Sequence, residues 1–391
     1  MAQVRSSIAE DFSITKGGPL HWLLVRLGHA GDERRLVLRR ALAVVLITWL
    51  PLLLLSLVQG LAWGRLIKIP FLRDFAVNVR LLVAVPILVL AESGIDRRWR
   101  TLVLEFLRSE LINEKSLPSF EAVLERTMRW RDRVLPEALL AVAAIFPSLF
   151  LVKTELLMTG TSNWHNVGSG GVSAAGWWFT LVSTPIFRFL LLRWFWRMFL
   201  WTSFLGSVSR INLFLVATHA DLAAGLGFLS EGQKSFSPII FAGGAVVAAE
   251  VGNAVAYQGA SLSSMKFPMI GYGVLAIIFL VLPLLVVAPV LLKIKRKGLF
   301  EYGAEVTIHN QLFEQKWIQE KLPAGETLLG SPDASSLADL GSSFTVVRQM
   351  RLVPIDKPTL IVLAVSAALP MLPVVLYATP TPELIRMLKM L

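Results

Sequence analysis

Three stretches of this 391-residue chain carry no charged residue over a length that would cross a lipid bilayer. They cover residues 41–64, 267–292 and 358–382. About 20 apolar residues suffice for a helix to span the hydrocarbon layer, where no water is present to satisfy the backbone of an open structure. The three runs alone predict a polytopic membrane protein built from helices.

The composition agrees with this prediction. Hydrophobic residues make up 55% of the chain, charged residues only 17%, and the mean hydropathy is +0.64, which is too apolar for a soluble globule of this size. The chain has no cysteine, which excludes disulfides, thiolate metal sites and cysteine nucleophiles. The first apolar run is much longer than a signal-peptide core, so we expect it to remain as a membrane anchor.

Hydropathy along the chain predicts an all-α fold, a polytopic membrane helix bundle of about seven transmembrane helices with cytoplasmic amphipathic helices. The expected spans are 41–63, 75–93, 136–158, 177–197, 237–257, 269–292 and 358–378.

The distribution of basic residues predicts the orientation. With the N-terminus inside, the inner segments hold 27 of the 38 Lys and Arg residues and the outer segments hold six. This is the positive-inside pattern, and it indicates a multi-pass protein of the inner cell membrane with a cytoplasmic N-terminus. We interpret the excess charge as contact with anionic lipid headgroups and not with nucleic acid. The residues expected there include Arg34, Arg35, Arg39, Arg40, Lys293, Lys295, Arg296 and Lys297.

This topology divides the chain into four parts. Residues 1–40 form a cytoplasmic N-terminal segment, and 41–292 form a six-span bundle with a cytoplasmic helical loop at 94–135. Residues 293–357 form a cytoplasmic helix and flexible linker, and 358–391 contain the seventh span and the C-terminal tail.

Several inner segments have helical or loop signatures of their own. Apolar residues at helical spacing predict amphipathic helices at 101–115, 119–134 and 300–321, the last extending the sixth span inward. Residues 322–343 are rich in Gly, Ser, Pro and Ala and are typical of a flexible connection. Residues 209–236 are unusually apolar for a cytoplasmic loop, which favours an interfacial or re-entrant segment.

Six of the seven predicted spans contain proline beyond their first turn, where it removes a backbone donor and kinks a helix. The remaining span, 237–257, carries a small residue at every fourth position, and this pattern lets helices approach closely. Its ridge consists of Gly244, Ala248, Gly252 and Ala256, and the opposite face carries Glu250, Asn253 and Tyr257. We therefore expect this helix at the centre of the bundle, with Glu250 turned to a cavity or a partner.

Arginines in the second and fourth spans need partners, because an unpaired arginine at the bilayer centre costs at least ~2.5 kcal/mol. Arg193 and Arg197 fall near the cytoplasmic end of their span, where we expect them to reach the headgroups. Arg188 and Arg80 fall deeper, and Glu250 lies at a matching depth. We predict a buried polar network of Arg80, Arg188 and Glu250 with Asn253 beside it, while Lys153 and Glu155 serve the outer rim.

Catalytic and metal motifs are mostly excluded. The segment from Gly227 to Ser235 only approximates a phosphate-binding loop, because Gln233 separates Gly232 from Lys234. His219 and Asp221, with His309 from another inner segment, form a speculative cytoplasmic site. The sequence contains neither H-E-x-x-H nor G-x-S-x-G, so we expect no cofactor, no metal and more likely no enzyme.

Three functions remain in order of preference. The first is a channel or transporter for a small ion or solute, with a weak preference for an anion because two arginines face one glutamate. The second is a non-conducting receptor or assembly subunit, either a homo-oligomer or bound to another membrane protein. The third is a membrane-bound lipid-modifying enzyme.

Overall fold

The computed structural model of the chain describes residues 6–26, 34–64, 67–150, 163–165, 171–319 and 332–379. Within these ranges the chain forms helices joined by loops and turns, with no strand beyond a single bridge between Ile69 and Asn163. The protein is an all-α helical bundle. The outer-rim residues Lys153 and Glu155 lie outside the described ranges, as does the tail from residue 380 onward.

Six helical segments are long and apolar enough to cross a membrane, which makes the chain a multi-pass membrane protein. They are Arg35–Val58, Phe75–Arg108, Ala174–Val208, Leu229–Gln258, Leu262–Leu285 and Lys357–Ala378. A seventh is formed if α7 (Leu117–Arg131) and α8 (Val134–Phe150), which meet at a 42° bend, are taken as one span. The predicted third span, 136–158, therefore begins in α8 and continues past the described residues.

Two spans share one internal pattern. Each begins with a five-residue helix capped by a side chain that accepts a backbone N–H: Asp74 caps α5 (Phe75–Val79) and Ser173 caps α10 (Ala174–Trp178). Five residues of π-helix follow, η2 (Arg80–Ala84) and η4 (Phe179–Ser183), and then the long helices α6 (Val85–Arg108) and α11 (Thr184–Val208).

Proline explains the widened turn in both spans. Pro86 and Pro185 lie in the first turns of α6 and α11, where a proline has no N–H to donate and its ring displaces an earlier carbonyl. Pro51 similarly begins α4 (Leu50–Val58) after α3 (Arg34–Thr48). These three breaks therefore lie at the junctions between helices, whereas Pro147, Pro268 and Pro283 lie inside a described helix.

The long helices cross the predicted boundaries of the spans. α6 continues without a break to Arg108, so the amphipathic helix predicted at 101–115 is the end of this same helix up to residue 108 and is wrong for 109–115, which form turns. α7 accounts for the helix predicted at 119–134. Beyond α14 (Leu262–Leu285), the chain turns and α15 (Ala288–Phe313) and η5 (Glu314–Gln319) follow. The flexible connection predicted at 322–343 is wrong for its second half, because α16 (Pro332–Gln349) is helical and packs back along α15.

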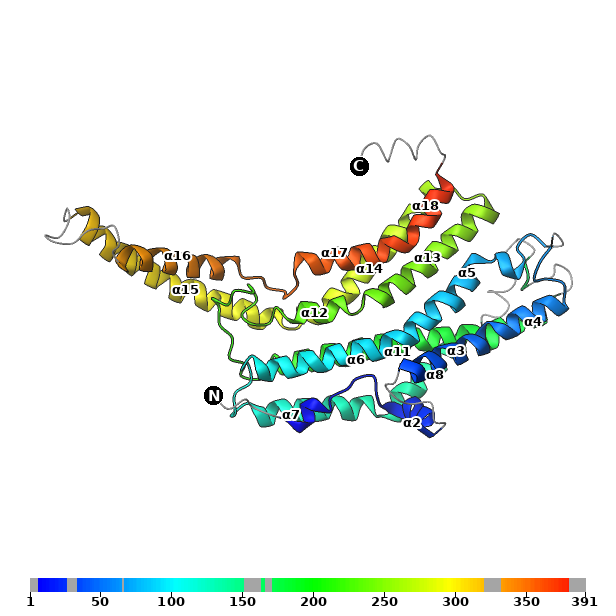
Figure 1. Cartoon of the computed structure of the whole chain (residues 1–391), viewed down its shortest axis with the longest axis horizontal. Coiled ribbons are helices and arrows are strands. Elements are labelled where there is room, and N and C mark those ends of the chain that lie inside the picture. Colours follow the sequence, from blue (N-terminus) through cyan, green and yellow to red (C-terminus); the bar gives the residue numbers. More distant parts are fainter. Residues whose placement is uncertain are drawn as a thin grey trace.

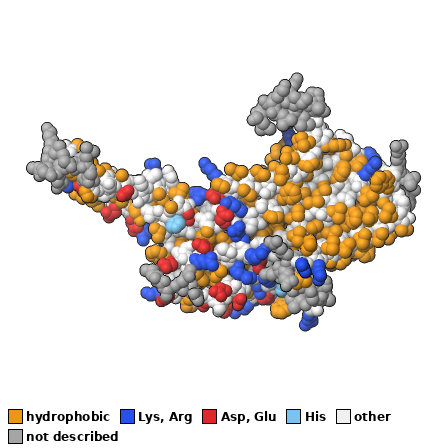
Figure 2. Space-filling view, viewed as in Figure 1, with side chains coloured by type: hydrophobic (Ala, Val, Ile, Leu, Met, Phe, Trp, Pro, Cys, Tyr) orange, Lys and Arg blue, Asp and Glu red, His pale blue; other side chains and the backbone are white. Residues whose placement is uncertain are grey.

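Figure 1 shows how these helices are arranged. α6 and α11 run through the middle of the molecule, with α7 and α8 along one side and α13 (Ser237–Gln258), α14, α17 (Lys357–Ala368) and α18 (Leu372–Ala378) along the other. α15 and α16 form a two-helix arm that extends away from the bundle. Figure 2 shows apolar side chains gathered over one part of this face and charged side chains over the remainder.

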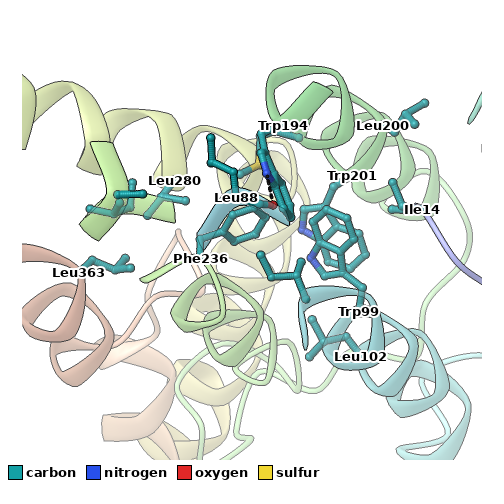
Figure 3. Packing of buried hydrophobic residues seen from close by; sticks show 14 of the residues in the cluster. Ile14, Leu88, Trp99, Leu102, Trp194, Leu200, Trp201, Phe236, Leu280 and Leu363 are labelled. Atoms are coloured by element: carbon teal, nitrogen blue, oxygen red, sulfur yellow. Dashed lines mark hydrogen bonds between the residues drawn. The ribbon is translucent and has the colours of Figure 1, made fainter. Parts of the chain in front are cut away.

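The core is aromatic where α6 meets α11. The Trp99 and Trp201 rings stack at 5.3 Å, Phe236 lies 5.5 Å from Trp99, and the Trp194 indole donates to the Leu88 carbonyl (Figure 3). Ring pairs of this kind contribute about 0.5–1.5 kcal/mol beyond their buried area. This packing holds α6 and α11 together from Leu88 to Trp99 on α6 and from Trp194 to Trp201 on α11.

α13 lies between neighbours on both of its faces. A Cβ built on Gly244 would come 2.7 Å from the Ala367 carbonyl oxygen of α17, so only glycine allows this approach. Further along, Gly252 faces Val374 and Phe75, and Ala248 is buried. Along this ridge α13 contacts α17, α18 and α5 through small residues.

Gly244→Val tests the close approach. The new side chain must push α13 away from α17, and overpacking of this kind costs about 1–3 kcal/mol, so we expect a lower thermal unfolding temperature in detergent. Gly271→Val on α14 is the matched control, because a Cβ there meets nothing within 4 Å. Equal melting temperatures for the two variants would contradict the packing described.

Candidate functional site

Five charged side chains from four helices meet between the inner halves of α6 and α11. We call this group the inner arginine centre: Arg40 of α3, Glu92 of α6, Glu137 of α8, and Arg193 and Arg197 of α11. Glu92 Oε1 accepts from Arg193 Nη1 at 3.3 Å and from Arg197 Nη2 at 3.0 Å. Its other oxygen lies 3.9 Å from Arg40 Nη1, and Glu137 Oε1 lies 3.6 Å from Arg193 Nε.

Four residues of the inner arginine centre are buried, and the Arg40 side chain is 13% exposed. Relative exposure is 3% for Arg197, 7% for Arg193 and 8% for Glu92, so the charges interact with little screening by water. The Trp194 ring lies 4.7 Å from the Arg197 guanidinium and adds a cation–π contact. Arg197 Nη1 and Arg40 Nε are buried and have no hydrogen-bond acceptor. Among these five described side chains, three arginines against two glutamates leave a surplus of one positive charge.

This arrangement corrects the prediction for Arg193, Arg197 and Arg40. We expected them at the headgroups, but they turn into the bundle because Glu92 and Glu137 offer acceptors there. Glu92 was missed because the sequence places it at the end of an apolar run, where a carboxylate usually faces water. The signal that could have found it is helical spacing: Arg193 and Arg197 are one turn apart, so a single carboxylate on a facing helix can meet both.

The N-terminal segment covers the inner side of the centre. A Cβ on Gly18, whose φ is +83°, would lie 2.9 Å from Glu137 Oε1, so glycine is required at the start of α2 (Gly18–Arg26). Arg131 Nη1 donates to the Ser13 carbonyl at 2.6 Å. Burial and the nearby Arg40 and Arg131 lower the pKa of His21 on α2, which keeps this ring neutral beside the arginines.

The predicted network of Arg80, Arg188 and Glu250 is divided in the structure. Arg80 Nη2 and Glu250 Oε1 form an ion pair at 2.5 Å, and the Phe187 ring lies 5.5 Å from the Arg80 guanidinium. Arg188 donates to Ser148 Oγ of α8 at 3.0 Å. The three side chains therefore join different helices: α13 with η2, and α11 with α8.

The other polar residues of α13 bind the start of α5. Asn253 donates to Asp74 Oδ1 at 2.8 Å and accepts from the Phe75 N–H at 3.0 Å, and the Tyr257 hydroxyl donates to the Arg73 carbonyl. Asp74 also accepts from the Trp164 indole at 2.9 Å. Together with the Arg80–Glu250 pair, these bonds form an outer polar contact that joins α13 to α5.

His165 lies beside this outer polar contact. Burial, opposed by Asp74 and assisted by Arg80, lowers the pKa of its ring to about 4. The ring stacks on Phe179 at 4.8 Å and is neutral at physiological pH. Sequence reasoning gave His165 no role, because a lone histidine in an outer loop carries no pattern.

The inner loop at 217–228 is organised around Asp221. The carboxylate accepts the backbone N–H groups of Ala223, Gly225 and Gly227 at 2.7–3.2 Å, and His219 Nδ1 lies 2.9 Å from Oδ1. Burial alone would raise the pKa of the Asp221 carboxyl, but the N–H donors and the His219 ring hold it below its usual value. This glycine-rich loop therefore directs three of its backbone N–H groups to its own carboxylate and not to a phosphate.

A pocket of about 430 Å³ lies beside this loop. Its wall includes His219, Asp221, Glu105, Ser109 and Glu110. His309, the third residue of the speculative cytoplasmic site, lies on α15 and contacts Ser336 of α16 at 3.1 Å. Among the described residues, no group of three His, Asp or Glu side chains is arranged to hold a metal ion.

The pockets do not lie along the predicted polar interior. The walls of four pockets in the described part of the chain do not include Arg80, Arg188 or Glu250. One of them, an apolar groove of about 420 Å³, follows the α13 ridge past Ala248 and Gly252 to Phe75 and Val374.

No family model, no curated protein and no solved structure matches this chain. No known protein therefore supplies a fold or a site for comparison with this chain.

Removal of the Glu92 charge tests the inner arginine centre. In Glu92→Gln the arginines lose their shared counter-ion inside the bundle, and breaking a buried pair in this way costs about 3–5 kcal/mol. We expect a large drop in thermal unfolding temperature in detergent. In the control Glu125→Gln, the exposed pair with Arg129 at 4.0 Å is worth at most about 1 kcal/mol. Similar small shifts for both variants would disprove the role of Glu92.

Because Asp221 holds the 217–228 loop together, we expect the stability of this loop to depend on pH. Because the folded pKa lies below the unfolded value of about 3.9, the stabilisation is complete above that value and is lost as the pH falls through the folded pKa. We expect amide exchange at Ala223, Gly225 and Gly227, corrected for intrinsic rates, to accelerate below about pH 4. In Asp221→Asn, exchange should be about tenfold faster at pH 7 and insensitive to pH. Unchanged protection in this variant would contradict the assignment.

Proposed function

We propose that the protein moves a small anion across the membrane. The observation that carries the proposal is the inner arginine centre, in which two buried arginines and the partly buried Arg40 face two glutamates, and two buried guanidinium nitrogens lack acceptors. Buried charge is costly in a membrane protein, so an excess that its own side chains leave unbalanced favours a bound ligand of opposite sign. A small anion has that charge and accepts hydrogen bonds from guanidinium groups.

Other arginines supply positions at different depths. At about 1.5 Å per residue, Arg80 lies in the outer part of the span Phe75–Arg108, and Arg188 lies deeper in the span Ala174–Val208. Arg193 and Arg197 follow Arg188 on the same helix. An anion crossing the bundle needs such a series of weak sites, each strong enough to accept it and weak enough to release it.

The closed packing favours a transporter or a gated channel over a permanently open pore. Most of the inner arginine centre is buried, and the segment containing Gly18 covers its inner side. The π-helical breaks at η2 and η4 are places where α6 and α11 can bend, because such bulges weaken the regular helix ladder. Movement at these breaks would expose the centre.

Arg40→Gln tests the proposal. It removes the surplus charge, while Arg193 and Arg197 keep their bonds to Glu92, so the variant is expected to fold. Loss of a charge-assisted contact worth about 1.5 kcal/mol lowers anion uptake roughly tenfold. Arg39→Gln is the matched control, since Arg39 is the exposed neighbour on the same helix.

The measurement is uptake of labelled chloride, nitrate, phosphate and acetate into liposomes containing the full chain, with and without the same anion inside. Uptake above empty liposomes by the wild type, reduced by Arg40→Gln alone, is the expected result. Wild-type protein that is folded and inserted but moves none of these anions would overturn the proposal.

A second function is supported by the pocket beside Asp221. It brings His219, Asp221 and Ser109 to one cavity at the inner end of α6. Glu110, Leu222 and Ala224, the described non-glycine residues with positive φ, lie in or next to its wall, and strained backbone clusters at catalytic sites. These features favour a membrane-bound lipid-modifying enzyme, for which His219→Ala would abolish turnover and leave anion uptake unchanged.

A receptor or assembly role would use the α15–α16 arm. Phe300, Ile308 and Leu312 are exposed along α15, so the arm offers apolar contacts outside the bundle. A chain that moves no anion and loses a co-purifying partner when 332–349 is deleted would favour this role.

A further inference from the structure

The largest of the described pockets lies where the bundle meets the α15–α16 arm. It measures about 630 Å³ and is formed by residues 209–217 on one side and by the first half of α15 on the other. This volume falls in the range of small-molecule binding sites, about 300–1,000 Å³. The loop side is held in place by the connection between α6 and α7, because the Phe214 N–H donates to the Leu111 carbonyl and Ser116 Oγ donates to the Asn212 carbonyl.

Three cations line this pocket. Arg210 follows the end of α11, and Lys293 and Lys297 project from successive turns of α15. Glu301 is the acidic residue of the wall. Its pair with Lys297 spans 3.6 Å between side chains that are 62% and 70% exposed, so it neutralises little of the charge. The pocket therefore attracts anions.

The rest of the wall is largely apolar. Ile211, Leu213, Leu215 and Val290 face the same space as the cations. A free inorganic anion would gain nothing from such a surface. A ligand with a charged head and an apolar body would bury both parts.

The position along the chain places the pocket at the surface of the membrane. Lys293 is the first charged residue after the uncharged run 267–292. On the face shown in Figure 2, Lys and Arg side chains gather at the edge of the apolar surface, near the region that Figure 1 labels α12 and α15. A cavity at this level opens to lipid headgroups, and basic pockets there bind anionic ones.

We propose that this pocket binds the phosphate group of an anionic phospholipid, with Arg210 and Lys293 contacting the phosphate. Lys297 contacts the rest of the headgroup, and the apolar wall contacts the glycerol and the first carbons of the acyl chains. The neighbouring Lys295 has a different task, because its Nζ donates to the Met350 carbonyl at 2.6 Å and ties α15 to the end of α16. The proposal is independent of whether the protein moves an anion.

The test measures retained lipid and melting temperature for the full chain in detergent. Phosphatidylglycerol, phosphatidylcholine and inorganic phosphate are added in separate arms at equal concentration. We expect phosphatidylglycerol alone to be retained in native mass spectrometry and to raise the melting temperature. Stabilisation by inorganic phosphate that also displaces phosphatidylglycerol would show a site for soluble phosphate and would overturn the lipid assignment.

Variants distinguish lipid binding in the pocket from general attraction of anionic lipid to the basic surface of the protein. Arg210→Gln/Lys293→Gln should weaken phosphatidylglycerol binding about tenfold or more, since each cation near the surface contributes several-fold. Lys293→Arg should keep the binding. Arg296→Gln/Arg39→Gln, which removes the same charge from exposed positions outside the wall, is the control. Equal losses in the control and in the pocket variant would overturn the proposal.

Discussion

Glu92 is the acceptor on which the inner half of the bundle depends. It is one carboxylate, and three arginines from two other helices point at it. Without it, α3 and α11 would bring like charges together in a buried space. With it, the same charges link α3, α6 and α11, and Glu137 extends the link to α8. The stacked tryptophans next to this group supply the apolar part of the same contact.

Hydropathy was sufficient to predict the class of fold. Apolar segments, three of them free of charge, predicted six helices that the structure places as candidate spans, and the bent pair α7–α8 occupies the position of the other. Boundaries were harder, since α6 and α11 continue well beyond the apolar part of their sequence as helices packed against α7 and α12 (Leu229–Lys234). Hydropathy indicates which part of a helix lies in lipid, whereas packing against neighbouring helices determines the residue at which the helix ends.

The partner of a charged side chain could be predicted where only the depth of the two residues within their spans had to be known. Arg80 and Glu250 were matched by counting residues from the outer ends of their spans, and they form an ion pair. The partners of Arg193 and Arg197 depended on which helices are neighbours and how each is rotated, and one sequence does not contain this information. The binding of the Asp221 carboxylate to N–H groups two to six residues further along was likewise hidden, because it depends on positive φ angles at Leu222 and Ala224.

Hydrogen bonds join the base of the α15–α16 arm to the loop at 217–228. Arg351, just beyond α16, donates through its backbone to the Leu222 carbonyl and through its guanidinium to the carbonyls of Asp221 and Ile355. Together with the link from Lys295 to Met350, this residue connects the base of the projecting arm to the loop at 217–228. A displacement of α15 and α16 would therefore reach the bundle at a turn in which Leu222 and Ala224 already adopt positive φ angles.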